Sequence, residues 1–188
     1  MKPPRTAAII LAAGSGRRMG GPKALLWVEG DTLLRRAART ALEAGCAPVV
    51  AVIGAWPPDL DGLDVQTVPN PGAGEGMASS LRLGLAALPP DTPAALILAV
   101  DQPAVDAVLL RGLLALAARD PERPAACAYA DTIGIPAVLP RRLFPDLLAL
   151  RGDRGAKAIL LREDTAPLPF PGGEADLDTP ADLDGFRR

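Results

Sequence analysis

A glycine-rich segment from Leu11 to Lys23 combines the residue types that bind phosphate. It has the sequence Leu-Ala-Ala-Gly-Ser-Gly-Arg-Arg-Met-Gly-Gly-Pro-Lys and directly follows a short apolar run. Glycines let backbone N–H groups approach a phosphate closely, and Arg17, Arg18 and Lys23 can neutralise the charge of a polyphosphate. The alternative is an ordinary turn with solvated charges. Composition and spacing favour phosphate binding.

Two common phosphate-binding motifs do not fit this segment. Met19 occupies the place of the third glycine in G-x-G-x-x-G, which argues against a dinucleotide site and a nicotinamide-dependent oxidoreductase. A proline separates Gly21 from Lys23, and Ala24 stands where the P-loop has a magnesium-binding Ser or Thr. The segment therefore predicts a nucleotide site of another kind.

Asp101 follows the most apolar run in the chain, Ala94 to Val100. Such a run predicts a buried central strand, and ligands of parallel sheets gather beyond the carboxyl ends of the strands. A carboxylate at this place can hold Mg²⁺ between nucleotide phosphates. The alternative is that Asp101 caps a helix or stabilises a turn before Pro103.

The chain contains no histidine. This excludes a Ser-His-Asp triad, a Cys-His pair and an H-E-x-x-H zinc site. Chemistry must therefore rest on carboxylates, lysine, arginine, backbone amides or a metal ion. A metal held by carboxylates alone is a hard, oxygen-preferring cation, which favours Mg²⁺ over Zn²⁺.

A second glycine-rich segment, Asn70 to Arg82, leads into an expected helix. Ser79, Ser80 and the free amides at a helix start can contact a ribose or a base. Simple N-capping by one of the serines is the alternative. Near the C-terminus, the acidic segment Asp176-Leu-Asp-Thr-Pro-Ala-Asp182 can supply metal ligands, but it is equally suited to start a helix.

The elements that must position these residues alternate between strand and helix. Apolar runs predict strands over 6–11, 48–53, 65–69, 94–100, 125–130 and 135–139, and helical spacing predicts helices over 33–44, 79–88, 107–118, 155–161 and 180–186. Repeated β-α-β units imply a mostly parallel sheet covered by helices. We expect a Rossmann-like, three-layer α/β/α fold, with residues 1–188 forming one domain.

The overall composition narrows the class of protein. A net charge of −2 argues against general binding to nucleic acid or to an anionic membrane. No apolar stretch reaches the roughly 18 residues that span a bilayer, so we expect a cytoplasmic protein. Cys46 and Cys127 match no redox or zinc spacing and are expected to be buried, inert thiols.

The first segment also resembles a known signature. L-A-A-G-x-G-x-R-M-G-x-P-K after the first strand is similar to the signature of the nucleotidyltransferases related to sugar-phosphate and molybdenum cofactor enzymes. The resemblance implies that the backbone wraps the nucleotide, that Arg18 holds the triphosphate and that Lys23 stabilises charge on the α-phosphate and pyrophosphate. The nucleotide-binding residues it implies, together with those of the second glycine-rich segment, are Leu11, Ala12, Ala13, Gly14, Ser15, Gly16, Lys23, Asn70, Gly76, Ser79 and Ser80.

Three further motifs resemble the cytidylyl branch of that family: Asp101-Gln-Pro, Gly76-Met-x-Ser-Ser and Asp176-x-Asp-Thr-Pro. The resemblance implies CTP as donor, the phosphate of molybdopterin as acceptor, and Mg²⁺ held by Asp101 with Asp176 or Asp178. It assigns the acceptor side to Gly134, Pro136, Arg154 and Lys157, although Gly-Ile-Pro stands here in place of the usual Gly-His-Pro. The product could pass to a molybdoenzyme.

Other activities stay open on sequence grounds. A guanylyltransferase of the same fold differs in base and acceptor pocket, and a sugar-phosphate nucleotidyltransferase differs in acceptor. A non-catalytic nucleotide-binding module is disfavoured because Lys23, Asp101 and Asp176 are all present. The nicotinamide-dependent oxidoreductase is disfavoured by the missing third glycine.

Overall fold

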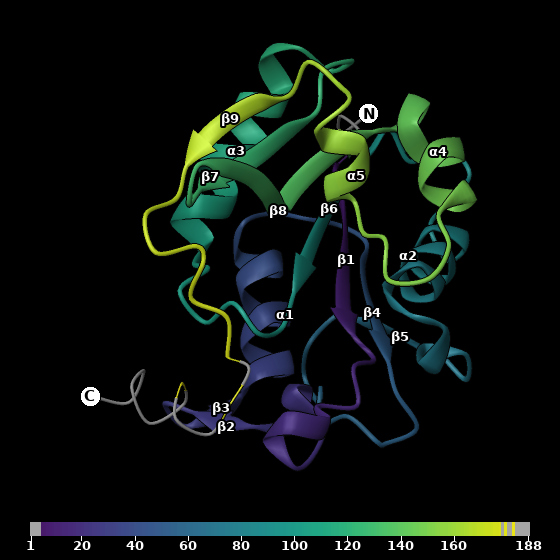
Figure 1. Cartoon of the computed structure of the whole chain (residues 1–188), viewed down its shortest axis with the longest axis vertical. Coiled ribbons are helices and arrows are strands. Elements are labelled where there is room, and N and C mark those ends of the chain that lie inside the picture. Colours follow the sequence, from purple (N-terminus) through teal and green to yellow (C-terminus); the bar gives the residue numbers. More distant parts are fainter. Residues whose placement is uncertain (1–4, 178, 180–181, 183–188) are drawn as a thin grey trace.

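The computed structural model describes residues 5–177, 179 and 182, and within them it has a seven-stranded sheet. The strand order is β5-β4-β1-β6-β8-β7-β9 (Figure 1). Only β8 runs antiparallel to its neighbours β6 and β7 among these strands. The strands are β1 (Ala7–Ala12), β4 (Val49–Ile53), β5 (Gln66–Pro69), β6 (Ala94–Ala99), β7 (Ala125–Tyr129), β8 (Thr132–Pro140) and β9 (Ala166–Pro169).

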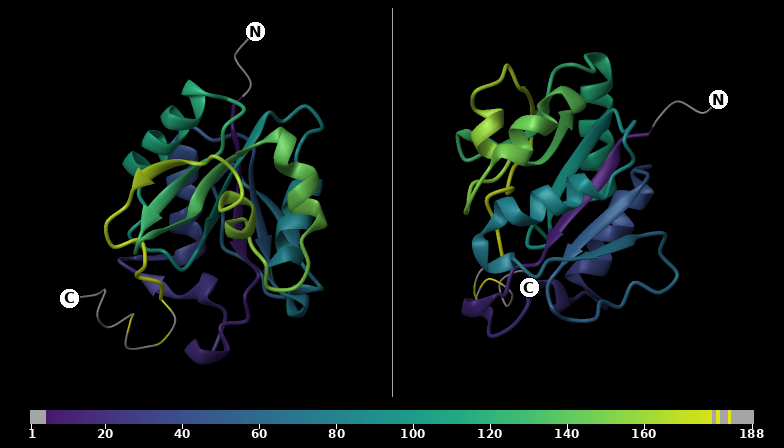
Figure 2. Two further views of the ribbon diagram at one scale, coloured as in Figure 1. Left: turned by 45° about the horizontal axis from the view of Figure 1, so that its top comes forward. Right: turned by 90° about the vertical axis from the view of Figure 1, so that its right-hand side faces the viewer.

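Helices cover both faces of the sheet (Figure 2). On one face lie α1 (Leu33–Glu43) and α3 (Ala107–Arg119). On the other lie α2 (Met77–Ala86), α4 (Phe144–Ala149) and α5 (Lys157–Leu160). A small hairpin, β2 (Trp27–Val28) with β3 (Asp31–Thr32), stands apart from the main sheet. Two apolar cores result, one on each side of the sheet.

The central strands form because their side chains are aliphatic on both faces. Ile9 and Ile10 of β1 are fully buried on opposite sides of the sheet, as are Leu96 and Ile97 of β6. Continuous aliphatic strands of this kind are typical of a sheet covered on both faces. The main helix of the first core, α1, begins at a cap in which the Thr32 hydroxyl accepts a hydrogen bond from the Arg35 amide at 3.2 Å.

The predicted three-layer α/β/α fold is confirmed, and most expected elements appear within one or two residues of their predicted bounds. The expected helix over 79–88 instead begins at Met77, and its N-cap is Gly76, with no side-chain cap. Strand β9, helix α4 and the β2–β3 hairpin were not predicted from the sequence. The helix expected over 180–186 lies outside the described residues, apart from Asp182. No helix in the described part of the chain is long and apolar enough to cross a bilayer.

Candidate functional site

A cleft of about 610 Å³ opens at the carboxyl ends of β1 and β6. Both strands are parallel neighbours, so the segments that follow them meet at one edge of the sheet. Many of the residues singled out from sequence line this cleft: Leu11, Ala12, Ala13, Gly14, Ser15, Gly16, Lys23, Gly76, Ser80, Asp101, Gly134, Lys157 and Asp176. The topology thus brings together segments that are far apart in sequence.

The glycine-rich segment after β1 folds into a tight loop around Gly16. The Gly16 carbonyl accepts hydrogen bonds from the amides of Met19 (2.8 Å) and Gly21 (3.3 Å). Gly16 has φ +56°, and a Cβ at this position would overlap the Gly21 carbonyl, so only glycine fits. The loop continues into a short 3₁₀ helix, Arg17–Met19. The side chain of Arg18 lies outside the described part of the structure.

Lys23 and Asp101 form an ion pair inside the cleft. The Lys23 Nζ lies 2.8 Å from the Asp101 Oδ2, and the two side chains are 17% and 25% exposed. Asp101 therefore does not cap the following helix, α3, whose N-cap is Asp106. The pair joins the end of the glycine-rich loop to the end of β6. When a nucleotide binds, the Lys23 ammonium can contact a phosphate and the Asp101 carboxylate can bind a metal ion.

Asp176 reaches the same end of the cleft from the C-terminal segment. The Leu177 amide donates a hydrogen bond to the Asp101 carbonyl at 2.9 Å, which fixes the adjoining Asp176 near Asp101. Figure 1 shows this segment running from β9 toward the β2–β3 hairpin. Within the described residues, no group of three or more acidic, His or Cys side chains clusters as a metal site. Two carboxylates remain a suitable partial set for a hard cation that also binds nucleotide phosphates. Asp178 lies outside the described residues.

A buried hydrogen-bond network shapes the start of α2. The Asn70 Nδ2 donates to the hydroxyls of Ser79 and Ser80, each at 2.9 Å, and its Oδ1 accepts from the Gly72 amide. The Ser79 hydroxyl donates within the loop, toward the carbonyls of Gly72 and Gly76. Neither serine caps α2, so the simple capping alternative is wrong. Asn70 and Ser79 are buried supports, whereas Ser80 lines the cleft.

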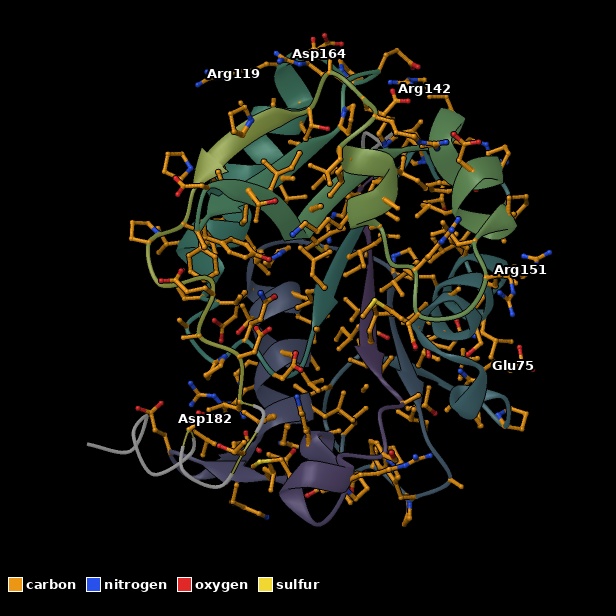
Figure 3. The ribbon with its side chains drawn as sticks, in the orientation of Figure 1. Glu75, Arg119, Arg142, Arg151, Asp164 and Asp182 are labelled. Atoms are coloured by element: carbon orange, nitrogen blue, oxygen red, sulfur yellow. The ribbon has the colours of Figure 1, made fainter. Side chains whose placement is uncertain are left out.

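The residues predicted for the acceptor side do not all lie in the cleft. Gly134 and Lys157 line the cleft, while Pro136 is buried in β8. Arg154 is exposed and lines a neighbouring depression of about 700 Å³ together with Arg151 and Arg162. Figure 3 shows Arg151 at the periphery of the molecule, pointing outward. The structure therefore does not place Arg154 and Lys157 in the same pocket.

Several lining residues were not predicted from sequence. Gln102, Tyr129, Ile135, Met77 and Asp153 all face the cleft. Gln102, Met77 and Ile135 carried a signal, because each stands inside a motif next to a predicted site residue, Asp101, Gly76 or Gly134. Tyr129 and Asp153 were not singled out, because they meet the cleft only through the tertiary fold and their residue types are common in strands and loops.

Tyr129 closes the cleft on the β7–β8 side. Its hydroxyl donates a hydrogen bond to the Ile135 carbonyl at 3.1 Å, and its ring meets Phe170 edge-on. Burial raises the pKa of Tyr129 above its ordinary value; hydrogen bonding with Gln102 opposes this rise, and the negative charges of Asp176 and Asp101 add to it. The tyrosine is therefore neutral at physiological pH and acts as a hydrogen-bond donor.

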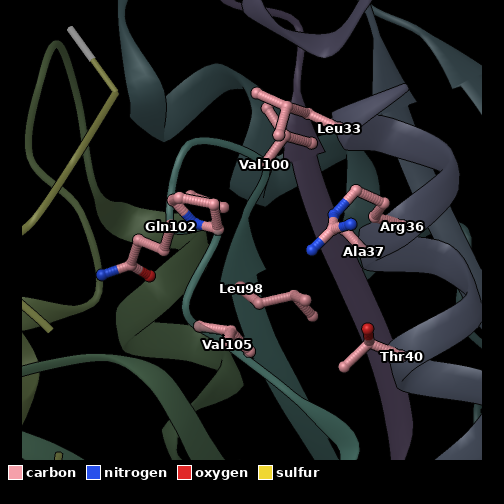
Figure 4. A pocket seen from close by; sticks show the side chains of 10 residues that line it. Leu33, Arg36, Ala37, Thr40, Leu98, Val100, Gln102 and Val105 are labelled. Atoms are coloured by element: carbon pink, nitrogen blue, oxygen red, sulfur yellow. The ribbon is translucent and has the colours of Figure 1, made fainter. Parts of the chain in front are cut away.

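A second cavity lies behind the cleft, between α1 and the end of β6 (Figure 4). It measures about 20 Å³ and is lined by Arg36, Thr40, Leu98 and Gln102, among others. A volume of this size holds one water molecule at most. This cavity is therefore too small for a nucleotide.

Comparison with known proteins places this arrangement in a family. Residues 8–166 match the model of the MobA-like NTP transferase domain. The chain is 34% identical to nicotine blue oxidoreductase of Paenarthrobacter nicotinovorans, over 84% of this chain and 82% of the relative. It is 33% identical to a molybdenum cofactor guanylyltransferase of Rhodobacter capsulatus, over 95% and 93% of the two chains.

Solved structures agree with this placement. The protein Rv0371c of Mycobacterium tuberculosis superposes with a TM-score of 0.81 at 28% identity, covering 97% of this chain and 98% of that one. The same protein in complex with manganese superposes with a TM-score of 0.78. The matched family model covers the glycine-rich loop, Lys23, Asp101 and the serine-bearing helix start. This chain belongs to the MobA-like NTP transferase family and is a nucleotidyltransferase by that membership.

Proposed function

We propose that this chain transfers CMP from CTP to the phosphate of molybdopterin and releases pyrophosphate, with Mg²⁺ as cofactor. The single observation that carries the proposal is the Lys23–Asp101 pair, which sits in the cleft where the glycine-rich loop meets the end of β6. CTP and molybdopterin are favoured by the cytidylyl-type motifs at Asp101, Gly76 and Asp176. We further propose that residues 1–188 act as a single domain.

The proposed reaction is an in-line displacement at the α-phosphate. An oxygen of the acceptor phosphate forms a bond to the α-phosphorus, and the bond from that phosphorus to the oxygen bridging to the β-phosphate breaks. The electron pair leaves with pyrophosphate. Because the acceptor oxygen is already anionic, no general base is needed, which agrees with a chain that has no histidine.

The residues of the cleft have distinct roles in this proposal. The loop from Leu11 to Gly16 wraps the nucleotide, and Arg18 and Lys23 stabilise the charge that develops on the phosphates. Ser80 meets the nucleoside, and Lys157 and Gly134 lie toward the acceptor. Holding donor and acceptor in line supplies most of the remaining rate enhancement.

Asp101 and Asp176 are the residues that would hold the metal. Their carboxylate oxygens are ligands that Mg²⁺ and Mn²⁺ both accept. When bound, the cation neutralises negative charge on the phosphates. The manganese complex of the M. tuberculosis relative supports a divalent cation in this fold.

A guanylyl donor is the second candidate, because the R. capsulatus relative is a guanylyltransferase. Another relative is named as an oxidoreductase, so the reaction is best tested directly. Purified protein is incubated with molybdopterin, Mg²⁺ and each NTP in turn, and pyrophosphate release is followed. We expect release with CTP at the highest kcat/KM, and none with Asp101→Ala. A clear preference for GTP would favour the guanylyl candidate. If none of the NTPs led to pyrophosphate release, the nucleotidyltransferase reaction would be rejected.

A further inference from the structure

The side chain of Gln102 ties together three segments that are distant in sequence. It is only 7% exposed. Its Nε2 donates to the Ile135 carbonyl of β8 at 3.2 Å and to the Gly173 carbonyl of the C-terminal segment at 3.3 Å. Gln102 itself follows Asp101 at the end of β6. One amide group therefore links the metal-facing strand end to the acceptor wall and to the C-terminal segment.

The orientation of this amide is fixed by its surroundings. Turning it over would point Oε1 at two carbonyl oxygens, which repel it, and both carbonyls would lose the hydrogen bond from Nε2, leaving the Ile135 carbonyl only its bond from the Tyr129 hydroxyl. In the present orientation Oε1 is buried and accepts no hydrogen bond from any described residue. Gln102 lines the small cavity together with Arg36 and Thr40 of α1, and Figure 4 shows its amide group pointing away from those two side chains.

A buried acceptor without a partner costs free energy. An apolar side chain of similar length, such as methionine, would avoid that cost. What the amide contributes in return is the pair of hydrogen bonds from Nε2 to the two carbonyls, beside its hydrogen bonding with Tyr129. The function of Gln102 must therefore be sought in the two segments that those bonds hold.

The C-terminal segment 173–177 is bound at both of its ends by adjacent residues of one turn. Gln102 holds the Gly173 carbonyl, and the Asp101 carbonyl accepts from the Leu177 amide at 2.9 Å. Asp176 lies between these two attachments and faces the cleft. Gly173 is also packed closely, because a Cβ there would lie 2.7 Å from the Tyr129 ring. The two residues that follow β6, Asp101 and Gln102, thus fix the path of this segment and the position of Asp176 within it.

We propose that Gln102 is a positioning residue that sets the Asp176 carboxylate opposite Asp101 for a divalent cation. The inference rests on the proposed function only in taking a divalent cation as the ligand of these two carboxylates. It does not depend on which nucleotide or acceptor is used. Residues that orient metal ligands typically change metal affinity 10- to 100-fold when they are replaced.

The test measures Mn²⁺ binding to the full chain by electron paramagnetic resonance, without nucleotide or acceptor. The variants are Gln102→Met, Asp176→Asn and the double variant. We expect each single variant to raise the Kd for Mn²⁺ by on the order of tenfold. Because both changes act through the same carboxylate, the double variant should bind no more weakly than Asp176→Asn alone.

Two further variants separate positioning from unspecific effects. Asp153→Asn removes another cleft carboxylate that has no link to Gln102, and should leave the Kd for Mn²⁺ unchanged. Gly173→Ala keeps the Gln102 side chain but crowds the rings of Phe170 and Tyr129, which displaces the same segment, and should weaken Mn²⁺ binding as Gln102→Met does. Thermal unfolding confirms that each variant is folded.

The inference is overturned if folded Gln102→Met binds Mn²⁺ as the wild type does, or if its effect adds fully to that of Asp176→Asn. It is also overturned if the wild-type chain does not bind Mn²⁺ at all. A failure of CTP turnover with intact Mn²⁺ results would reject the proposed donor and acceptor but leave the role of Gln102 standing.

Discussion

At the scale of single residues, Lys23 allows a sharp test between a catalytic and a purely structural role. It is mostly buried and pairs with Asp101, so it is more than a solvated loop charge. If its ammonium stabilises charge that builds on the α-phosphate, Lys23→Ala removes an interaction made mainly in the transition state. We expect kcat to fall on the order of 10²-fold, with a smaller change in KM for CTP.

Lys23→Arg is the informative companion, since it keeps the positive charge. A planar guanidinium cannot replace a compact ammonium in a closed loop, so rescue should be poor. Steady-state kinetics and thermal unfolding of both variants provide the measurement. An unchanged kcat in Lys23→Ala would reject the catalytic role and leave only the ion pair with Asp101.

The two adjacent serines of α2 are predicted to differ. The Ser80 hydroxyl accepts from Asn70 and lines the cleft, so its own proton can be donated to a bound nucleoside. Ser80→Ala should raise KM for CTP about 3- to 10-fold with little change in kcat, the loss expected of one neutral hydrogen bond. Ser79 donates into its own loop, so Ser79→Ala should chiefly lower the free energy of unfolding, by about 1 kcal/mol. Equal kinetic effects of the two changes would contradict this division.

At the scale of elements, α2 must lie very close to the sheet for Ser80 to reach the cleft. Gly84 makes this possible, because a Cβ there would lie 2.5 Å from Ile9 Cγ2 and 3.2 Å from Val52 Cγ2. Both neighbours are buried, β-branched side chains that move little. Gly84→Ala should therefore lower the free energy of unfolding by about 1–3 kcal/mol, as measured by urea denaturation.

A second helical glycine supplies the matched control. Gly112 of α3 has only Leu168 Cδ2 near its would-be Cβ, at an ordinary 3.5 Å. Gly112→Ala should stabilise the protein by about 0.4–1 kcal/mol, because alanine loses less backbone entropy on folding. A destabilisation of similar size at both positions would show that crowding against β1 is not the cause at Gly84.

The same elements show what sequence could and could not predict. The central strands and α1 were predictable because burial on both faces of a sheet and on one face of a helix leaves a periodic apolar pattern. Strand β9 was not, because it contains two prolines in four residues and sits at the sheet edge, where its pairing with β7 is a long-range contact. Gln102 was noticed as part of a motif, but its role depends on carbonyls 33 and 71 residues away.

At the scale of the whole molecule, burial of both thiols makes the free energy of unfolding depend on pH in the alkaline range. Cys46 and Cys127 are buried on the α1–α3 side of the sheet, and burial raises the pKa of each from 9.0 to about 12. The unfolded chain therefore loses these protons near pH 9, while the folded chain keeps them until about pH 12. Between these values the folded state binds more protons than the unfolded state.

The sign of the effect follows from this difference. Since the unfolded state binds fewer protons, the free energy of unfolding falls as pH rises through this window, and it is unaffected below about pH 8. Because the unfolded thiols are only half ionised at pH 9, each contributes roughly 1.4 kcal/mol over the whole range from pH 8 to pH 10, so the two together should lower stability by about 3 kcal/mol there. Tyr129, whose pKa is also raised, adds to the loss of stability only above its ordinary pKa of 10.0.

Urea denaturation at pH 7, 8, 9 and 10 measures how steeply the free energy of unfolding falls with pH. The double variant Cys46→Ala, Cys127→Ala should be less stable at pH 7, but its free energy of unfolding should fall much less between pH 7 and pH 10 than that of the wild type. If the free energy of unfolding of this variant falls as much as that of the wild type, groups other than the two thiols cause the decline.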